Sequence, residues 1–153
     1  MSTFKVNVVA RNPKSEELAT KPLEALVDTG SELTWLPAEV LKSAGITPRR
    51  RRMFATATQE KIERETGYAI LSAEGYETND EVVFAETGDM TLLGVRTLEG
   101  FGVMVDNIGH RFVATTTIVA AGKSMPKREL MWQAQNSQWS RMPKMETGPR
   151  SLL

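Results

Sequence analysis

The first half of the chain alternates between short apolar runs and polar turns. Residues 4–10 are rich in β-branched side chains and partly alternate in polarity, which predicts a strand. The polar residues 11–17 predict a turn, and residues 20–27 predict a second strand that ends in an acidic turn. A short apolar run at 33–36 then leads into a predicted helix over 37–45, since proline suits the first helical position and glycine commonly ends a helix.

The middle of the chain predicts two longer strands joined by a polar tip. Residues 49–73 carry this pattern, with the tip near 58–60, and a helix over 59–65 is the alternative for the same residues. Gly67 is interpreted as a turn residue. Residues 81–86 predict a further strand, because β-branched and aromatic side chains dominate there.

The elements become shorter past residue 90. Residues 91–94 predict a short buried strand, residues 95–100 a helical turn, and residues 103–120 a hairpin whose turn lies at 106–109. Many short strands with frequent turns and one or two short helices are typical of an all-β fold, a small barrel or sandwich.

The composition shifts near residue 123. From there the chain is rich in Lys, Arg, Gln, Ser, Pro and Met, which predicts a domain over 1–122 followed by a polar tail over 123–153. Residues 130–139 can form a short helix with Trp132 and Trp139 on one side. The last dozen residues of the tail are predicted to be disordered.

Charge and residue counts exclude several kinds of site. Lysine plus arginine and aspartate plus glutamate each number 19, so no overall field would attract nucleic acid or an anionic membrane. The chain has no cysteine and one histidine, His110. Disulfides, thiolate nucleophiles and multi-histidine metal sites are therefore excluded, and no metal or cofactor is predicted. The basic run Arg49–Arg52 suggests nucleic acid or an acidic partner or, as is usual for a short run in a neutral protein, a solvated face.

The chain carries no sequence signal for a membrane or for export. No apolar run approaches the roughly 18 residues that a membrane-spanning helix needs. The first twelve residues lack a basic stretch followed by a long apolar core, so they do not resemble a secretory signal. The expected location is the cytoplasm.

Two motifs about sixty residues apart carry the candidate chemistry. Residues 25–31 read A-L-V-D-T-G-S, and residues 91–98 read T-L-L-G-V-R-T-L. Peptide hydrolysis without a metal needs a water made nucleophilic and a carbonyl made electrophilic, and two facing carboxylates that share one proton supply both. The simpler alternative is a β-protein in which one strand ends by chance in an Asp-Thr-Gly turn.

The pair of motifs resembles the retropepsin-like aspartic peptidases over about residues 3–120. In that family an apolar strand leads into Asp-Thr/Ser-Gly, a flap hairpin follows, and an apolar-apolar-Gly segment precedes a short helix. The resemblance implies a small closed β-barrel with one or two short helices and an active site at a two-fold dimer interface. It also implies an aspartic endopeptidase that cuts peptide or protein substrates.

The resemblance assigns roles to individual residues. Asp28 would be the catalytic residue, with Thr29 bracing the loop, Gly30 allowing close approach of the backbone, and Ser31 bonding to the outer carboxylate oxygen. The segment that packs beneath this loop would be Leu92, Leu93 and Gly94, and the flap tip would be Ala57, Thr58, Gln59 and Glu60.

The number of aspartate triplets implies a dimer. The mechanism needs two aspartates, and the chain has one Asp-Thr-Gly triplet. Single-lobe members of the family form a two-fold dimer in which each chain gives one aspartate, so a homodimer is expected. The alternative is a catalytically silent retropepsin-like module that serves in dimerisation or peptide binding.

The chain departs from the viral members of the family at two places. Ser31 stands where many of them have alanine, and Val95 stands where they have an arginine that pairs with an acidic residue beyond the triplet. Arg96 comes one residue later, and Glu32 occupies the acidic position. An ion pair between Glu32 and Arg96 is therefore a hypothesis that the structure can decide.

Overall fold

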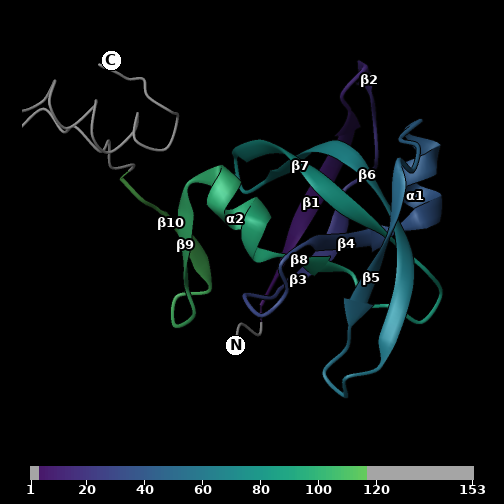
Figure 1. Ribbon diagram of the computed structural model, residues 1–153. Helices are drawn as coiled ribbons and strands as arrows, with labels where there is room; N and C mark the ends of the chain where they lie inside the picture. The colour runs from purple at the N-terminus through teal and green to yellow at the C-terminus, as the bar shows by residue number, and fades with distance from the viewer. Residues whose placement is uncertain (1–3, 117–153) are drawn as a thin grey trace, which may run out of the picture. The chain divides into compact units, whose positions relative to one another are not determined.

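The computed structural model describes residues 4–116 of the chain (Figure 1). Strands dominate this part and two short helices interrupt them, which confirms the prediction of an all-β fold. The elements in chain order are β1 (Lys5–Asn12), β2 (Ser15–Ala19), β3 (Leu23–Val27), β4 (Thr34–Pro37), α1 (Ala38–Ser43), β5 (Arg50–Ala55), β6 (Lys61–Ala73), β7 (Tyr76–Ala85), β8 (Leu92–Leu93), α2 (Val95–Phe101), β9 (Val103–Asp106) and β10 (Arg111–Ala114).

One eight-stranded sheet contains all the strands up to β8. Its order is β2-β1-β3-β8-β4-β7-β6-β5, and β9 pairs with β10 in a separate hairpin. β1 also pairs with β6, so the hydrogen-bonded neighbours from β1 through β3, β8, β4, β7 and β6 form a circuit that returns to β1. This circuit is consistent with the expected barrel. Figure 1 shows the short strands β3, β4 and β8 close together, and the β5–β6 hairpin extending away from them.

The core lies between the inward faces of the strands. Along β1 the buried positions alternate at Val6, Val8 and Ala10, as the period of a strand requires. α1 adds Leu41 to this core and α2 adds Leu98. Burying one such aliphatic side chain stabilises the fold by about 1.5–3 kcal/mol, so the core holds in place the loops between these elements.

The prediction of a turn over residues 11–17 is wrong for most of that range. Asn12 still belongs to β1, and its side-chain Oδ1 accepts a hydrogen bond from the N–H of Lys14 at 2.9 Å, which closes a tight turn at Pro13 and Lys14. β2 then starts at Ser15 and pairs with β1. Its side chains are mostly exposed, so no apolar alternation marks it as a strand.

The strand predicted over 81–86 starts earlier, at Tyr76. Glu74 and Gly75 have φ values of 53° and 84°, and they form the turn that returns the chain from β6 to β7. The early residues of β7 are polar and largely exposed, whereas the last six, residues 80–85, are buried. The apolar pattern in the sequence therefore predicted only the buried half of β7 as a strand.

The middle hairpin is confirmed as two strands, and the alternative helix over 59–65 is wrong, because β6 starts at Lys61. Gly67 is not a turn residue, since it lies inside β6. A Cβ atom there would lie 2.6 Å from the carbonyl oxygen of Thr47 and 3.0 Å from the ring of Phe84. Gly67 therefore serves close packing of the backbone.

The late hairpin forms where the sequence predicts it. The side chain of Asp106 accepts hydrogen bonds from the N–H groups of Ile108 and Gly109, both at 3.0 Å, and from Nε of Arg111 at 3.1 Å. These bonds hold the turn between β9 and β10.

Several predictions fall on the remaining residues. The end of that hairpin, the helix over 130–139 and the disordered last dozen residues lie outside the described residues, and the domain boundary at 122 stays a prediction. Within residues 4–116, no helix has the length and apolar character needed to span a bilayer.

Candidate active site

Asp28 lies directly after β3, at the point where that strand leaves the sheet. β3 runs parallel to β8, with Leu26 opposite Leu92 and Val27 opposite Leu93. The N–H of Asp28 continues this pairing by donating to the carbonyl oxygen of Leu93 at 2.9 Å. The strand pairing therefore fixes the backbone of Asp28, and the residue is half-buried.

The turn after Asp28 binds one of the two oxygens of its carboxylate. The N–H of Gly30 donates to Oδ1 at 2.9 Å. Among the hydrogen bonds of residues 4–116, none reaches Oδ2. The carboxylate is thus oriented through one oxygen, and the other oxygen keeps its capacity to accept hydrogen bonds.

The other two residues of this turn differ in how they are held. Thr29 is exposed, and its hydroxyl has no hydrogen bond within residues 4–116, so its bracing of a partner loop stays a prediction. Ser31 does not bond to the carboxylate as expected. Its hydroxyl donates to the carbonyl oxygen of Leu33 at 2.8 Å, which fixes the passage from the loop into β4.

The Leu92-Leu93-Gly94 segment packs beneath the Asp28 loop, residues 28–31. Leu93 is fully buried, and a Cβ atom on Gly94 would collide with the carbonyl oxygen of Leu33. The first N–H groups of α2 also bond to the loop: that of Val95 donates to the carbonyl oxygen of Ser31 at 2.8 Å. The loop thus satisfies donors at the start of α2 that have no partner inside the helix.

A buried chain of hydroxyls continues below this contact. The N–H of Gly94 donates to Oγ1 of Thr34 at 2.9 Å, and that oxygen lies 2.6 Å from Oγ1 of Thr97. The Thr97 hydroxyl donates to Oδ2 of Asp80 at 3.0 Å. Since each hydroxyl has one proton, Thr34 donates to Thr97. Asp80 on β7 is therefore connected by hydrogen bonds to the segment under the Asp28 loop.

Asp28 lines a cleft of about 640 Å³ between its own loop and the β5–β6 hairpin. This volume lies within the range of sites that bind small ligands or short peptide segments. The lining residues are Asp28, Gly30, Ser31, Glu32, Leu33, Trp35, Arg52, Met53, Phe54, Ala55, Thr56, Ala57, Ile62 and Leu92. The structure thus brings the predicted catalytic loop and the start of the predicted flap tip to one cleft.

Hydrogen bonds around Thr56 close the tip of the hairpin. The N–H of Thr56 donates to the carbonyl oxygen of Glu60 at 2.8 Å, and the N–H of Gln59 donates to the carbonyl oxygen of Thr56 at 2.8 Å. Gln59 has a φ of 68°, a conformation that glycine would adopt at less cost. Of the four predicted tip residues, Ala57 lines the cleft, whereas Thr58, Gln59 and Glu60 lie beyond its lining.

A match to a family model covers residues 17–100, from β2 to α2. The family is described as "gag-polyprotein putative aspartyl protease". The chain belongs to this family. Among curated proteins, none matches the chain. The matched residues of this gag-type protease domain include the Asp28 loop, the hairpin and the Leu92-Leu93-Gly94 segment, so the retropepsin-like resemblance is confirmed at the level of the family.

The aromatic wall of the protease cleft joins the hairpin to the sheet. Trp35 on β4 and Phe54 on β5 make an edge contact, with ring centroids 5.1 Å apart and ring planes at 61°. The guanidinium carbon of Arg52 lies 5.7 Å from the centroid of the Phe54 ring, within the range of a cation–π contact. Trp35 therefore belongs to the cleft wall.

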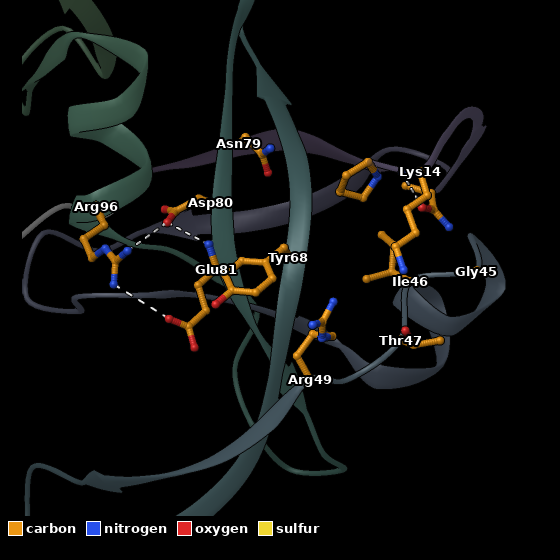
Figure 2. A pocket seen from close by; sticks show the side chains of 12 residues that line it. Lys14, Gly45, Ile46, Thr47, Arg49, Tyr68, Asn79, Asp80, Glu81 and Arg96 are labelled. Carbon is orange, nitrogen blue, oxygen red and sulfur yellow. Dashed lines mark hydrogen bonds and ion pairs between the residues drawn. The ribbon is translucent and has the colours of Figure 1, made fainter.

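The hypothesis of a Glu32–Arg96 ion pair is wrong. The N–H of Arg96 donates to the carbonyl oxygen of Glu32 at 3.0 Å, but its guanidinium lies 3.5 Å from Oδ1 of Asp80 and 3.9 Å from Oε1 of Glu81 (Figure 2). Asp80 and Glu81 are nearly buried on β7. The sequence did not predict a structural role for either residue. The sequence feature that could have indicated one is an acidic pair directly before the apolar residues of a strand.

Glu81 binds two arginines of the basic run Arg49–Arg52. It accepts hydrogen bonds from Arg50 at 3.0 and 3.1 Å, from Arg52 at 3.0 Å and from the hydroxyl of Thr66 at 2.7 Å. Burial alone raises the pKa of Glu81, but the bonds from Arg50 and Thr66 and the charge of Arg52 outweigh it, so the pKa is lowered. Arg51 pairs with Glu63 and Glu65 on the neighbouring strand. Most of this run is thus paired within the sheet.

Proposed function

We propose that the protein is an aspartic endopeptidase, and that two copies of the chain share one active site. The observation that carries this proposal is the carboxylate of Asp28, which is held by one oxygen, open at the other, and lies on a cleft bounded by a hairpin. Membership of a family of aspartyl proteases supports it.

The chemistry needs a pair of carboxylates that hold one proton. The ionised carboxylate takes a proton from water as its oxygen attacks the carbonyl carbon of the peptide bond, and the protonated carboxyl donates to the carbonyl oxygen. The tetrahedral intermediate then breaks its C–N bond. The leaving nitrogen takes the proton that the first carboxylate accepted from water, and a hydroxyl of the intermediate returns a proton to the second carboxylate, which restores the pair. The two carboxylates must lie close enough to titrate as a pair, as they do in aspartic proteases.

Within residues 4–116, a single chain does not supply a second catalytic carboxylate beside that of Asp28. Besides Asp28, the acidic side chain that lines the cleft is Glu32, which is exposed. A second copy related by a two-fold axis would place its own Asp28 loop opposite the first, and Thr29 is exposed for such a contact. The β5–β6 hairpin of each copy would then cover the substrate and exclude water.

Asp28→Asn removes the ionisable group and keeps the shape of the side chain. With a peptide library at mildly acidic pH, we expect wild type to cleave and Asp28→Asn to lose about a thousandfold or more in kcat/KM, the scale of a catalytic group. Glu39→Gln, on the exposed face of α1, is the matched control for the loss of one negative charge. Glu32→Gln tests an active site within one chain, and its inactivity would contradict the shared site.

Mixing the two forms tests whether the site is shared. Wild type and Asp28→Asn are combined in equal amounts and allowed to exchange subunits. If one site needs two aspartates, activity per chain falls to about a quarter of wild type, whereas independent chains would keep about half. A mixture that keeps half the activity refutes the shared site. Wild type that cleaves no peptide, yet binds peptides and dimerises, favours the catalytically silent module.

A further inference from the structure

A second cavity lies away from the Asp28 cleft. Its volume is about 500 Å³, and it shares no lining residue with that cleft. Elements far apart in the sequence form it, among them the turn after β1, the loop after α1, β6, β7 and the start of α2 (Figure 2). The lining residues are Asn12, Pro13, Lys14, Gly45, Ile46, Thr47, Arg49, Tyr68, Asn79, Asp80, Glu81 and Arg96.

The two carboxylates of this cavity are already occupied. Asp80 accepts hydrogen bonds from Thr97 and from the N–H of Glu81, and Glu81 is bonded by Arg50 and Arg52. Their exposed fractions are 8% and 4%, so neither offers much surface to a ligand. They therefore do not make the cavity a cation site.

The cations of the cavity outnumber its carboxylates. Arg96 lies near both Asp80 and Glu81, but Lys14 and Arg49 form no ion pair within residues 4–116. Both side chains are exposed, and in the view of Figure 2 they lie on the opposite side of the Tyr68 ring from Arg96. An anion placed there would gain two charged partners without having to break an existing pair.

The remaining lining suits a peptide better than a free inorganic anion. Tyr68 is 48% exposed as a residue, and an aromatic ring offers an apolar face. The side-chain amide of Asn79 has no hydrogen bond within residues 4–116 and can both donate to and accept from a peptide backbone. A single phosphate would fill only a small part of about 500 Å³.

We propose that this cavity binds an acidic peptide segment, with its carboxylates on Lys14 and Arg49 and its backbone beside Tyr68 and Asn79. A ligand held here leaves the Asp28 cleft open, because the two cavities have separate linings. The attraction is electrostatic and partly exposed, so it weakens as salt is added. This binding does not depend on catalysis, so it stands or falls separately from the peptidase activity.

The test is a titration of the full-length, isotope-labelled protein with tetraglutamate, followed by the shifts of its amide resonances. We expect shifts at Gly45, Thr47 and Asn79 and none at Asp28 or Gly30. Arg49→Gln should weaken binding about tenfold, the usual effect of losing one charged hydrogen bond. Lys21→Gln is the matched control, since Lys21 is exposed and unpaired within the described residues and lines neither cavity.

Four results would overturn the proposal. They are no saturable binding, shifts confined to the Asp28 cleft, equal weakening in Arg49→Gln and Lys21→Gln, and complete displacement of tetraglutamate by millimolar inorganic phosphate. The third would mean nonspecific charge attraction, and the last would mean a site for small anions. Circular dichroism of each variant establishes that a loss of binding does not come from unfolding.

Discussion

The hydroxyl oxygens of Thr34 and Thr97 lie 2.6 Å apart, and this contact joins β4 to α2 beneath the Asp28 loop. Thr34 also accepts a hydrogen bond from the N–H of Gly94, and Thr97 donates to Asp80. Both threonines are fully buried, so each polar group in this chain depends on its neighbour for a partner. The position of the apolar-apolar-Gly segment is therefore set by side chains as well as by the strand pairing.

Thr34→Val tests this chain of hydroxyls. Valine keeps the branched shape of threonine, but it leaves the buried N–H of Gly94 without an acceptor. We expect the free energy of unfolding, measured with denaturant, to fall by about 1–3 kcal/mol. Thr34→Ser keeps the hydroxyl and should lose less. Equal stability of the two variants would mean that the hydrogen bonds contribute little.

Gly94 and Gly30 should respond differently to alanine. A Cβ atom on Gly94 collides with the backbone of Leu33, so Gly94→Ala should cost about 1–3 kcal/mol of stability. A Cβ atom on Gly30 has one near neighbour, Oδ1 of Asp28 at 3.2 Å. Gly30→Ala should therefore leave the denaturation midpoint nearly unchanged and lower kcat/KM of the proposed reaction. A large loss of stability in Gly30→Ala, or no loss in Gly94→Ala, would contradict this difference between the roles of the two glycines.

The sequence could predict those parts of the site whose structure depends on residues adjacent in the chain. The strand before Asp28, the glycine turn and the Leu92-Leu93-Gly94 segment each show their role in a few adjacent residues. The two-stranded hairpin also follows from its own pattern. β2 was missed because an edge strand with exposed side chains has no apolar period.

The ion pairs could not be predicted, because they depend on strand register. Arg50 lies opposite Thr66 on β6, and Thr66 lies opposite Val83 on β7. This register of the three strands brings the side chain of Arg50 to Glu81. Spacing along the chain suggested Glu32 as the partner of Arg96, whereas the fold offers two nearly buried carboxylates instead. The burial of an acidic residue therefore cannot be predicted from the sequence until the positions of its cationic partners are known.

Glu81→Gln should reveal a pH-dependent contribution to stability. The pKa of Glu81 is lowered from its ordinary value of 4.5, so the ionised form stabilises the fold above that pH. We expect Glu81→Gln to lose about 2 kcal/mol near neutral pH, because a nearly buried acceptor of several charged hydrogen bonds is weakened. The difference from wild type should shrink as the pH falls below 4.5 and through the folded-state pKa.

The measurement is denaturant unfolding of both proteins from neutral to acidic pH. Glu16→Gln is the control, since Glu16 lies exposed on β2 and has no ion pair within residues 4–116. Its stability should follow wild type at every pH. A gap between Glu81→Gln and wild type that stays constant across the acidic range would exclude ionisation of Glu81 as the cause.

Trp35→Ala tests the aromatic wall of the cleft. The side chain lines the cleft and makes the edge contact with Phe54, which lies near the tip of the hairpin. An aromatic pair of this kind contributes about 0.5–1.5 kcal/mol, so its loss should raise KM about three- to tenfold while kcat changes less. Met104→Ala is the control, because Met104 is exposed on β9 and lines neither cavity. If both variants show the same KM, the wall does not position the substrate and the hairpin contact has a structural role only.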